Sequence, residues 1–356
     1  MFVWNKTPLT KTIILLWLTI FLFAACSSPA AIITEVVETP VTEPTNTSEP
    51  EPTQAEPTAV EPTTAATDTP VPEIEVEPLI FTDGLDREVM LDKPAQKIVS
   101  MAPSNTEILF AIGAGEQVIG RDEFSDYPAQ AASLPSVGGG FGDYNLEAIV
   151  DLEPDLVLTA EINTPEQVKS LEDLGMTVYF LKNPTSIDEM YENLLTVAEM
   201  TGHLEETEQL VEDLRRRVSK IESLVENVEE QPTAFYELDA TDPSAPWTAG
   251  SGTFIDTLIS MAGGENIASD MEGQYLQISI EELLVRDPQV ILLGDAAYGI
   301  TPESLSERTG WKNMSAVADN RIFTFDDNLV SRPGPRLVDG LEELAKILHP
   351  ELFENQ

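Results

Sequence analysis

Few residues in this chain have the types and spacing that catalysis or metal binding requires. The sequence has two histidines, His203 and His349, and one cysteine, Cys26, so we expect no metal site built from His and Cys ligands. GGGFG (138–142) is followed by no lysine and preceded by no strand, which argues against a phosphate-binding loop. GSG (250–252) lacks the nucleophile-elbow pattern and a suitably placed histidine. We therefore expect no enzyme, no resident metal and no cofactor.

A repeated acidic residue indicates recognition chemistry instead. LEAIVDLEPDLVLT (146–159) is repeated in outline as IEELLVRDPQVILL (280–293), and in each a Glu is followed seven residues later by a Pro and an apolar run. Both stretches predict a helix, a turn and a strand, with Glu147 or Glu281 in the first helical turn. Such an acid either complements the helix dipole or pairs with a cation of a partner protein.

The N-terminus has the layout of a secretion signal. Two lysines precede an apolar stretch, Ile13 to Ala25, which is shorter than the ~20 residues that a membrane-spanning helix needs. FAAC resembles a lipobox, so we expect residues 1–25 to be removed and Cys26 to be lipidated. An ordinary signal peptide and an uncleaved anchor are the alternatives. With one cysteine, no intrachain disulfide is available to an exported protein.

Residues 26–78 differ in composition from the rest. After Cys26 this stretch is dominated by Pro, Thr, Glu and Ala and has neither Lys nor Arg, which predicts a disordered tether. The whole chain carries a formal net charge of −44. Dispersed carboxylates keep an exported protein soluble, and a surface this acidic repels nucleic acid. We expect a monomer that binds no nucleic acid.

From about residue 79 short strands alternate with helices, which predicts parallel βα units. A hairpin with Asp83-Gly84 at its turn is expected first. A second repeat relates SNTEILFAIGAGEQVI (104–119) to SGTFIDTLISMAGGENIA (251–268). Two repeats in the same order indicate two similar α/β lobes.

Residues 203–230 predict one long amphipathic helix between the lobes. Apolar residues recur three or four positions apart from Leu204 to Val228, with charges between them. A coiled-coil arm is the alternative. A single apolar stripe is more typical of a helix that packs along its own protein.

Four segments in order resemble the helical-backbone class of ABC-transporter substrate-binding proteins. They are KIVSMAPSNTEILFAIGAGEQVIGRDEFSDYP (97–128), VGGGFGDYNLEAIVDLEPDLVL (137–158), PWTAGSGTFIDTLISMAGGENIA (246–268) and DDNLVSRPGPRLVDGLEEL (326–344). The resemblance implies an N-terminal α/β lobe (79–202), a bridging helix (203–230) and a C-terminal α/β lobe (231–356). It also implies mainly parallel sheets, with a ligand cleft between the lobes.

The same resemblance assigns roles to individual residues. Glu147 and Glu281 fall where the family meets arginines of the two permease subunits, one acid per lobe. The positions that correspond to the family's ligand contacts are Ser104, Asn105, Phe124, Phe141, Trp247, Tyr275 and Arg332. Arg332 is expected to clamp a carboxylate, amide or phosphate of the ligand, and Arg336 is expected to be structural.

The implied function is delivery of a metal chelate to a permease dimer by a lipid-anchored binding protein on the outer face of the membrane. A corrinoid such as cobalamin, or a ferric siderophore, suits a cleft lined by aromatic side chains. Haem is an alternative ligand, with Tyr127, Tyr144 or Tyr275 as an axial ligand. A surface sensor or adhesion lipoprotein without a transporter is the alternative class.

Overall fold

The computed structural model describes residues 77–140 and 143–354. The signal sequence, Cys26, the tether up to residue 76 and Phe141 lie outside the described residues. The elements below belong to one compact unit, Val71–Gln356. In the described part of the chain, no helix combines the length and the apolar character that crossing a membrane requires.

The N-terminal lobe is built on a four-stranded parallel sheet with the order β4-β3-β5-β6. Its strands are β3 (Ile98–Ser100), β4 (Val118–Arg121), β5 (Leu156–Ala160) and β6 (Val178–Leu181). Its helices are α1 (Pro103–Ala111), α2 (Leu146–Asp151), α3 (Pro165–Asp173) and α4 (Ile187–Thr201). The predicted hairpin is confirmed: β1 (Leu79–Thr82) pairs antiparallel with β2 (Glu88–Leu91).

The C-terminal lobe repeats this plan with a parallel sheet of order β12-β11-β7-β9. Its strands are β7 (Thr233–Glu237), β9 (Glu265–Asn266), β11 (Val290–Leu293) and β12 (Ile322–Thr324), and an antiparallel ribbon joins β8 (Trp247–Ala249) to β10 (Tyr275–Gln277). Its helices are α6 (Phe254–Met261), α7 (Ile280–Arg286), α8 (Pro302–Leu305), α9 (Ser315–Ala318), α10 (Asn328–Ser331) and α11 (Leu337–Leu348). The two lobes are thus similar in build, as the repeats predicted.

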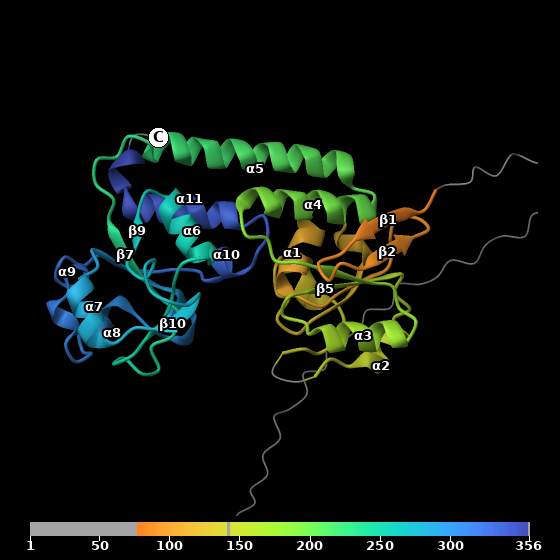
Figure 1. Ribbon diagram of the computed structural model, residues 1–356, viewed down its shortest axis with the longest axis horizontal. Helices are drawn as coiled ribbons and strands as arrows, with labels where there is room; N and C mark the ends of the chain where they lie inside the picture. The colour runs from red at the N-terminus through yellow and green to blue at the C-terminus, as the bar shows by residue number, and fades with distance from the viewer. Residues whose placement is uncertain (1–76, 141–142, 355–356) are drawn as a thin grey trace, which may run out of the picture. The chain divides into compact units, whose positions relative to one another are not determined.

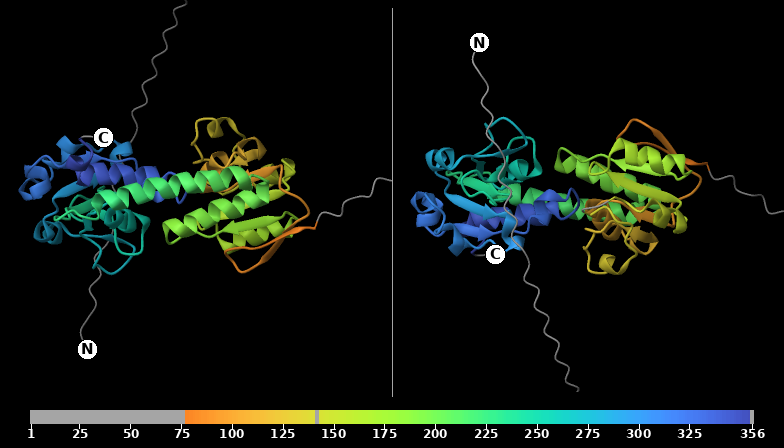
Figure 2. Two further views of the ribbon diagram at one scale, coloured as in Figure 1. Left: turned by 90° about the horizontal axis from the view of Figure 1, so that it is seen from above. Right: turned by 90° about the horizontal axis from the view of Figure 1, so that it is seen from below.

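The bridging helix is α5 (Leu204–Val225), which runs across both lobes (Figures 1 and 2). Its buried stripe is Thr207, Val211, Leu214, Val218 and Ile221, spaced four, three, four and three residues apart. This stripe belongs to a hydrophobic cluster that includes residues of α4 in one lobe and α11 in the other. The predicted fold class is confirmed, and the coiled-coil alternative is wrong, because the stripe is buried within the same chain.

The bridging helix is shorter than the sequence predicts. It ends at Val225 with Glu226 as its C-cap, whereas the prediction extends to residue 230. Glu229 and Glu230 follow, and acidic residues are unfavourable at the negative end of a helix dipole. Pro232 then begins the approach to β7, and a proline disfavours helical backbone in the residue before it.

The two quoted acidic repeats have the same local structure. Asn145 caps α2 and Ser279 caps α7, each through a side chain that accepts a bond from a backbone N–H of the first turn. Each helix is followed by a left-handed residue, Glu153 (φ 50°) or Asp287 (φ 44°), directly before a proline. The chain then enters β5 in one lobe and β11 in the other. The sequence repeat is therefore a repeat of backbone conformation as well.

Candidate functional site

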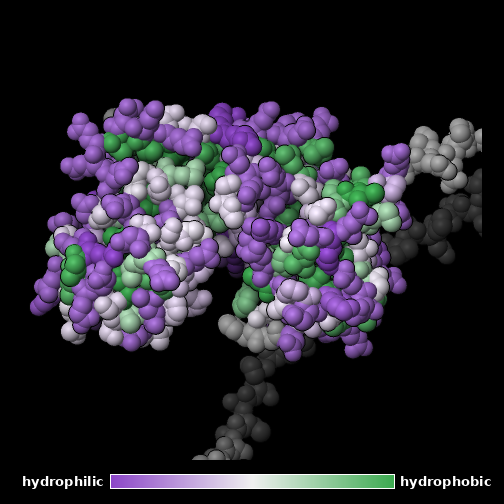
Figure 3. Space-filling model, in the orientation of Figure 1, coloured by the Kyte–Doolittle hydropathy of each residue, from purple (hydrophilic) through white to green (hydrophobic). Residues whose placement is uncertain are grey.

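A hollow separates the two lobes on the side opposite α5 (Figure 3). The lobes meet at its base through a network of ion pairs, and exposed aromatic residues lie on loops and strand ends of both lobes. The hollow lies where the interlobe cleft is predicted, and its role in holding a ligand stays a prediction.

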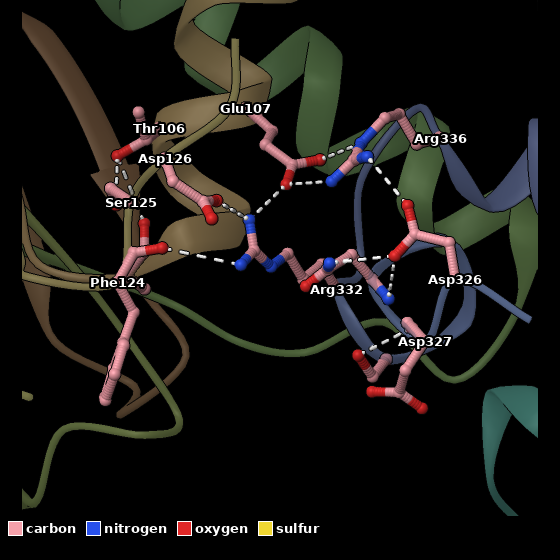
Figure 4. Close-up of polar contacts among 12 residues, drawn as sticks. Thr106, Glu107, Phe124, Ser125, Asp126, Asp326, Asp327, Arg332 and Arg336 are labelled. Carbon is pink, nitrogen blue, oxygen red and sulfur yellow. Dashed lines mark hydrogen bonds and ion pairs between the residues drawn. The ribbon is translucent and has the colours of Figure 1, made fainter. Parts of the chain in front are cut away.

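The centre of the base is Glu107 of α1, whose side chain is only 1% exposed (Figure 4). Arg332, just after α10 in the other lobe, donates from Nη1 to Glu107 Oε1 at 2.9 Å. Arg336, which precedes α11, donates from Nε and Nη2 to the two Glu107 oxygens at 2.7 and 2.6 Å. One buried carboxylate of the N-terminal lobe therefore holds two guanidiniums of the C-terminal lobe.

Arg332 is engaged by further groups of the N-terminal lobe. Its Nη1 also donates to Asp126 Oδ1 at 2.8 Å, and its Nη2 donates to the Phe124 carbonyl at 3.4 Å. Its side chain is 14% exposed. Arg332 thus lies at the lobe junction, where its Nη1 and Nη2 atoms already bond to groups of the N-terminal lobe. Its role as a ligand clamp stays a prediction.

Arg336 has a second role in this junction. The ring of Tyr127 lies 3.9 Å from the Arg336 guanidinium carbon, which is a cation–π contact between the lobes. A pocket of about 490 Å³ lies beside this contact, between α1, α5 and the start of α11. The structural role expected for Arg336 is consistent with these contacts.

The predicted aromatic contacts fall in two groups. Trp247 and Tyr275 lie in the C-terminal lobe on β8 and β10, and their side chains are 43% and 59% exposed. Trp247 is opposite Gln277 and Tyr275 is opposite Ala249, so the two rings are diagonal neighbours on one face of the ribbon. Phe124 belongs to the N-terminal lobe and is 43% exposed. In Figure 4 its carbonyl faces Arg332 and its ring points away from the ion pairs.

Ser104 and Asn105 are more deeply buried than the aromatic residues. Ser104 is 7% exposed and Asn105 is fully buried, at the start of α1. The Asn105 amide donates to the Leu158 carbonyl at 3.1 Å, while its Oδ1 has no partner among the described residues. Their assignment as ligand contacts stays a prediction.

The three tyrosines considered for haem differ in their surroundings. Tyr127 stacks on Arg336, as described above. The Tyr144 hydroxyl donates to the Met101 carbonyl at 2.9 Å and accepts from Asn163, and burial raises its pKa to about 12. Burial and the negative charge of Asp327 also raise the pKa of Tyr275. Raised values oppose the tyrosinate form that would ligate iron.

The two candidate docking acids occupy equivalent positions. Glu147 and Glu281 are each the second residue of a capped helix, both are exposed, and neither forms an ion pair within the part of the chain that the structure describes. Helices α2 and α7 lie on the side of their lobes away from α5 (Figure 1).

The histidines serve the packing of the lobes. His203 is the N-cap of α5 and lies close to Gly113, while buried His349 is 3.0 Å through Nε2 from the Gly263 carbonyl. Gly113 and Gly263 follow the equivalent helices α1 and α6, and both have positive φ. Among the residues that the structure describes, no group of three or more His, Cys, Asp or Glu is arranged to hold a metal ion.

Sequence reasoning missed the ion pairs of Glu107 with Arg332 and Arg336. A signal for them existed: Glu107 is the lone acid in TEILFAIG, and an acid within an apolar helix must be buried with a cationic partner. SRPGPR supplied two arginines, but nothing in its spacing indicates which of them reaches Glu107.

Sequence reasoning also missed a buried carboxylate pair at the ends of β7 and β11. Fully buried Glu237 accepts from Arg308 at 2.5 and 2.9 Å. Asp295 is 4% exposed, and its Oδ1 has no partner in the described part of the chain. Burial first, and then the negative charge of Glu237, raise the pKa of Asp295 to about 7.

Comparison with known proteins gives a consistent result. A family model described as "Periplasmic binding protein" matches residues 98–329. An uncharacterized ABC transporter substrate-binding lipoprotein of Bacillus subtilis is 31% identical over 285 residues, which are 79% of this chain and 88% of that protein. The vitamin B12-binding protein of Vibrio cholerae is 30% identical over 256 residues, 72% of this chain and 90% of its own length. Among solved structures, the periplasmic heme-binding protein of Roseiflexus sp. RS-1 in apo form has a TM-score of 0.65 at 27% identity, and the match covers 72% of this chain and 99% of that one.

Proposed function

The chain belongs to the periplasmic binding protein family, as its resemblance to ABC-transporter binding proteins predicted, and we propose that it captures a metal chelate between its lobes for an importer. The observation that carries this proposal is the exposure of Trp247 and Tyr275 as diagonal neighbours on one face of the β8–β10 ribbon. Large exposed rings bury much area against a flat ligand and lose little conformational entropy. A corrinoid or a ferric siderophore is the proposed cargo.

Similarity supports a corrinoid in particular, because the Vibrio cholerae relative is named for vitamin B12. Haem is the second candidate, since the Roseiflexus neighbour is named for heme.

A binding screen tests the cargo. Purified protein is titrated with cyanocobalamin, cobinamide, haemin and several ferric siderophores, and quenching of tryptophan fluorescence is followed. Trp247 is half-exposed whereas Trp311 is buried, so the response is expected to come largely from Trp247. Trp247→Phe is the control for the signal, with equilibrium dialysis as an independent readout. If no chelate binds by either method, the proposal is wrong.

We propose further that Glu147 and Glu281 dock the protein on a permease dimer. A protein with pseudo-twofold symmetry that sits on a twofold partner needs one equivalent contact per lobe. Exposed ion pairs contribute only ~0–1 kcal/mol each, but they set orientation and encounter rate. Helices α2 and α7 both lie away from α5, and each presents an acid without an intramolecular ion pair among the described residues.

Charge reversal tests this role against a purely structural one. Glu147→Lys with Glu281→Lys is expected to abolish uptake and leave ligand affinity unchanged. The matched control is Glu205→Lys with Glu206→Lys, because these acids are also exposed, in the first turn of α5, and give the same change of net charge. If both double variants lower uptake equally, or neither does, then helix-dipole compensation rather than docking accounts for the two acids.

We propose that Cys26 carries a lipid that keeps the protein on the outer face of the cell membrane. The lipobox-like FAAC and the description of the Bacillus subtilis relative as a lipoprotein support this. Cys26→Ser is expected to release the protein from the membrane fraction, and mass spectrometry of the wild type is expected to find a diacylglyceryl group on the cysteine. An unmodified cysteine would exclude the anchor.

A further inference from the structure

Carboxylates outnumber guanidiniums at the base of the cleft. The two cationic groups are those of Arg332 and Arg336. Four carboxylates surround them or lie next to them, belonging to Glu107, Asp126, Asp326 and Asp327 (Figure 4). Asp126 and Asp326 have side chains 67% and 51% exposed, so their charge faces solvent rather than the protein interior.

Both arginines already have carboxylate partners, which offsets their attraction for an anionic ligand. To pair with an anionic ligand, Arg332 would have to break its ion pair with Glu107, whose side chain is 1% exposed, or break its ion pair with Asp126 and keep the one with Glu107. Separating a buried carboxylate from its cation is strongly unfavourable, because the remaining charge stays buried without compensation. The Arg336 guanidinium is bound to both Glu107 oxygens and covered by the Tyr127 ring.

The negative potential extends to the exposed aromatic ribbon. Asp327, which accepts a hydrogen bond from the Tyr236 hydroxyl at 2.9 Å, is close enough to Tyr275 for its charge to raise that side chain's pKa, after burial. The formal net charge of −44 adds a long-range field of the same sign. An anionic ligand is therefore repelled during approach, and in the described part of the chain both guanidiniums at the base of the cleft already have carboxylate partners.

We propose that the cleft takes a metal chelate that is neutral or cationic, and that it discriminates against chelates with free carboxylates or other net negative charge. This inference rests on the proposed function, because it concerns the charge of the ligand held in the same cleft. It assigns uncharged corrinoids and ferric hydroxamates to the accepted class. It places ferric catecholates, and haem with its two propionates, in the rejected class.

Matched probes test the charge of the ligand separately from its shape. Cyanocobalamin is compared with its monocarboxylic acid, in which one amide is a carboxylate. N-acetylferrioxamine B, which is neutral at its modified amine, is compared with the N-succinyl derivative, which has a carboxylate there. Affinity for the purified protein is measured at low and high salt. For whichever parent binds, the added carboxylate is expected to weaken binding roughly tenfold or more, and salt is expected to reduce the difference.

Two variants connect the effect to the base of the cleft. Asp126→Asn removes one partner of Arg332 and is expected to reduce the difference in affinity between each parent and its carboxylate derivative. Asp188→Asn removes an exposed carboxylate that pairs with Arg215 of α5, and it is expected to leave this difference in affinity unchanged. If the carboxylate derivative binds as tightly as its parent, or haemin binds more tightly than every neutral probe, the charge inference is wrong and the binding function stands. If no probe binds, both proposals fail.

Discussion

Replacing Glu107 by glutamine tests whether the buried ion pairs hold the lobes together. Glutamine keeps the shape of the side chain but leaves Arg332 and Arg336, 14% and 11% exposed, without their shared counter-charge. Removing one partner of a buried pair costs about 3–5 kcal/mol. Because Asp126 still faces Arg332 at 2.8 Å, we expect a loss near the lower end, about 3 kcal/mol of unfolding free energy.

Urea unfolding followed by circular dichroism measures this loss. The midpoint is expected to fall while the dependence on urea stays the same, since the surface exposed on unfolding does not change. Asp188→Asn is the matched control, because its pair with Arg215 at 2.7 Å is exposed and removing it should cost less than ~1 kcal/mol. If Glu107→Gln is no more destabilising than Asp188→Asn, the ion pairs do not brace the lobes.

Two further predictions concern single side chains. Burial and Glu237 raise the pKa of Asp295 to about 7, so between about pH 4 and pH 7 the folded protein keeps a proton there that the unfolded chain has lost. The contribution of this carboxyl to stability therefore falls as pH rises from about 4 to about 7 and stays constant above that. Asp295→Asn is therefore expected to become more stable than the wild type as pH rises from 4 to 8, by roughly 2–4 kcal/mol at pH 8, and equal thermal-unfolding profiles over that range would contradict this. Val285 is 80% exposed on α7, one turn after Glu281. Val285→Ser should therefore change the unfolding free energy by less than ~0.5 kcal/mol, yet it should weaken capture of the protein by the permease in a pull-down if α7 docks there. Unchanged capture would show that Val285 is not part of the interface.

The lobes could be predicted because their signals are local and occur twice. The hairpin at Asp83 and the helix–turn–strand units after Asn145 and Ser279 each follow from capping residues, turn residues and apolar runs within a few positions. Their repetition also indicated that the chain forms two similar lobes, which one copy alone does not indicate. The side of the lobe on which each unit lies then follows from the right-handed rule for parallel βα units.

The base of the cleft could not be predicted in the same way, because its partners are far apart in sequence. Glu107 and Arg332 are separated by 225 residues, and Glu107 and Arg336 by 229. Both arginines lie in one short segment, and only the path of the chain after α10 decides how they share the carboxylate. The resemblance predicted Arg332 as a ligand contact, which stays a prediction. It did not indicate that Glu107 of α1 pairs with Arg332 across the lobes.

The connection of the lobes by α5 and by the Glu107 ion pairs also affects how a partner recognises the ligand-bound protein. Helix α5 packs its buried stripe against helices of both lobes, and Glu107 joins the lobes through charges that are costly to separate. A ligand can move the lobes only by as much as its differential binding energy allows, and large opening would expose these groups. We therefore expect Glu147 and Glu281 to keep nearly the same separation with and without ligand. A permease that docks on both acids must then sense the cargo through the ligand itself or through loops at the cleft, rather than through a change in the spacing of its two contacts.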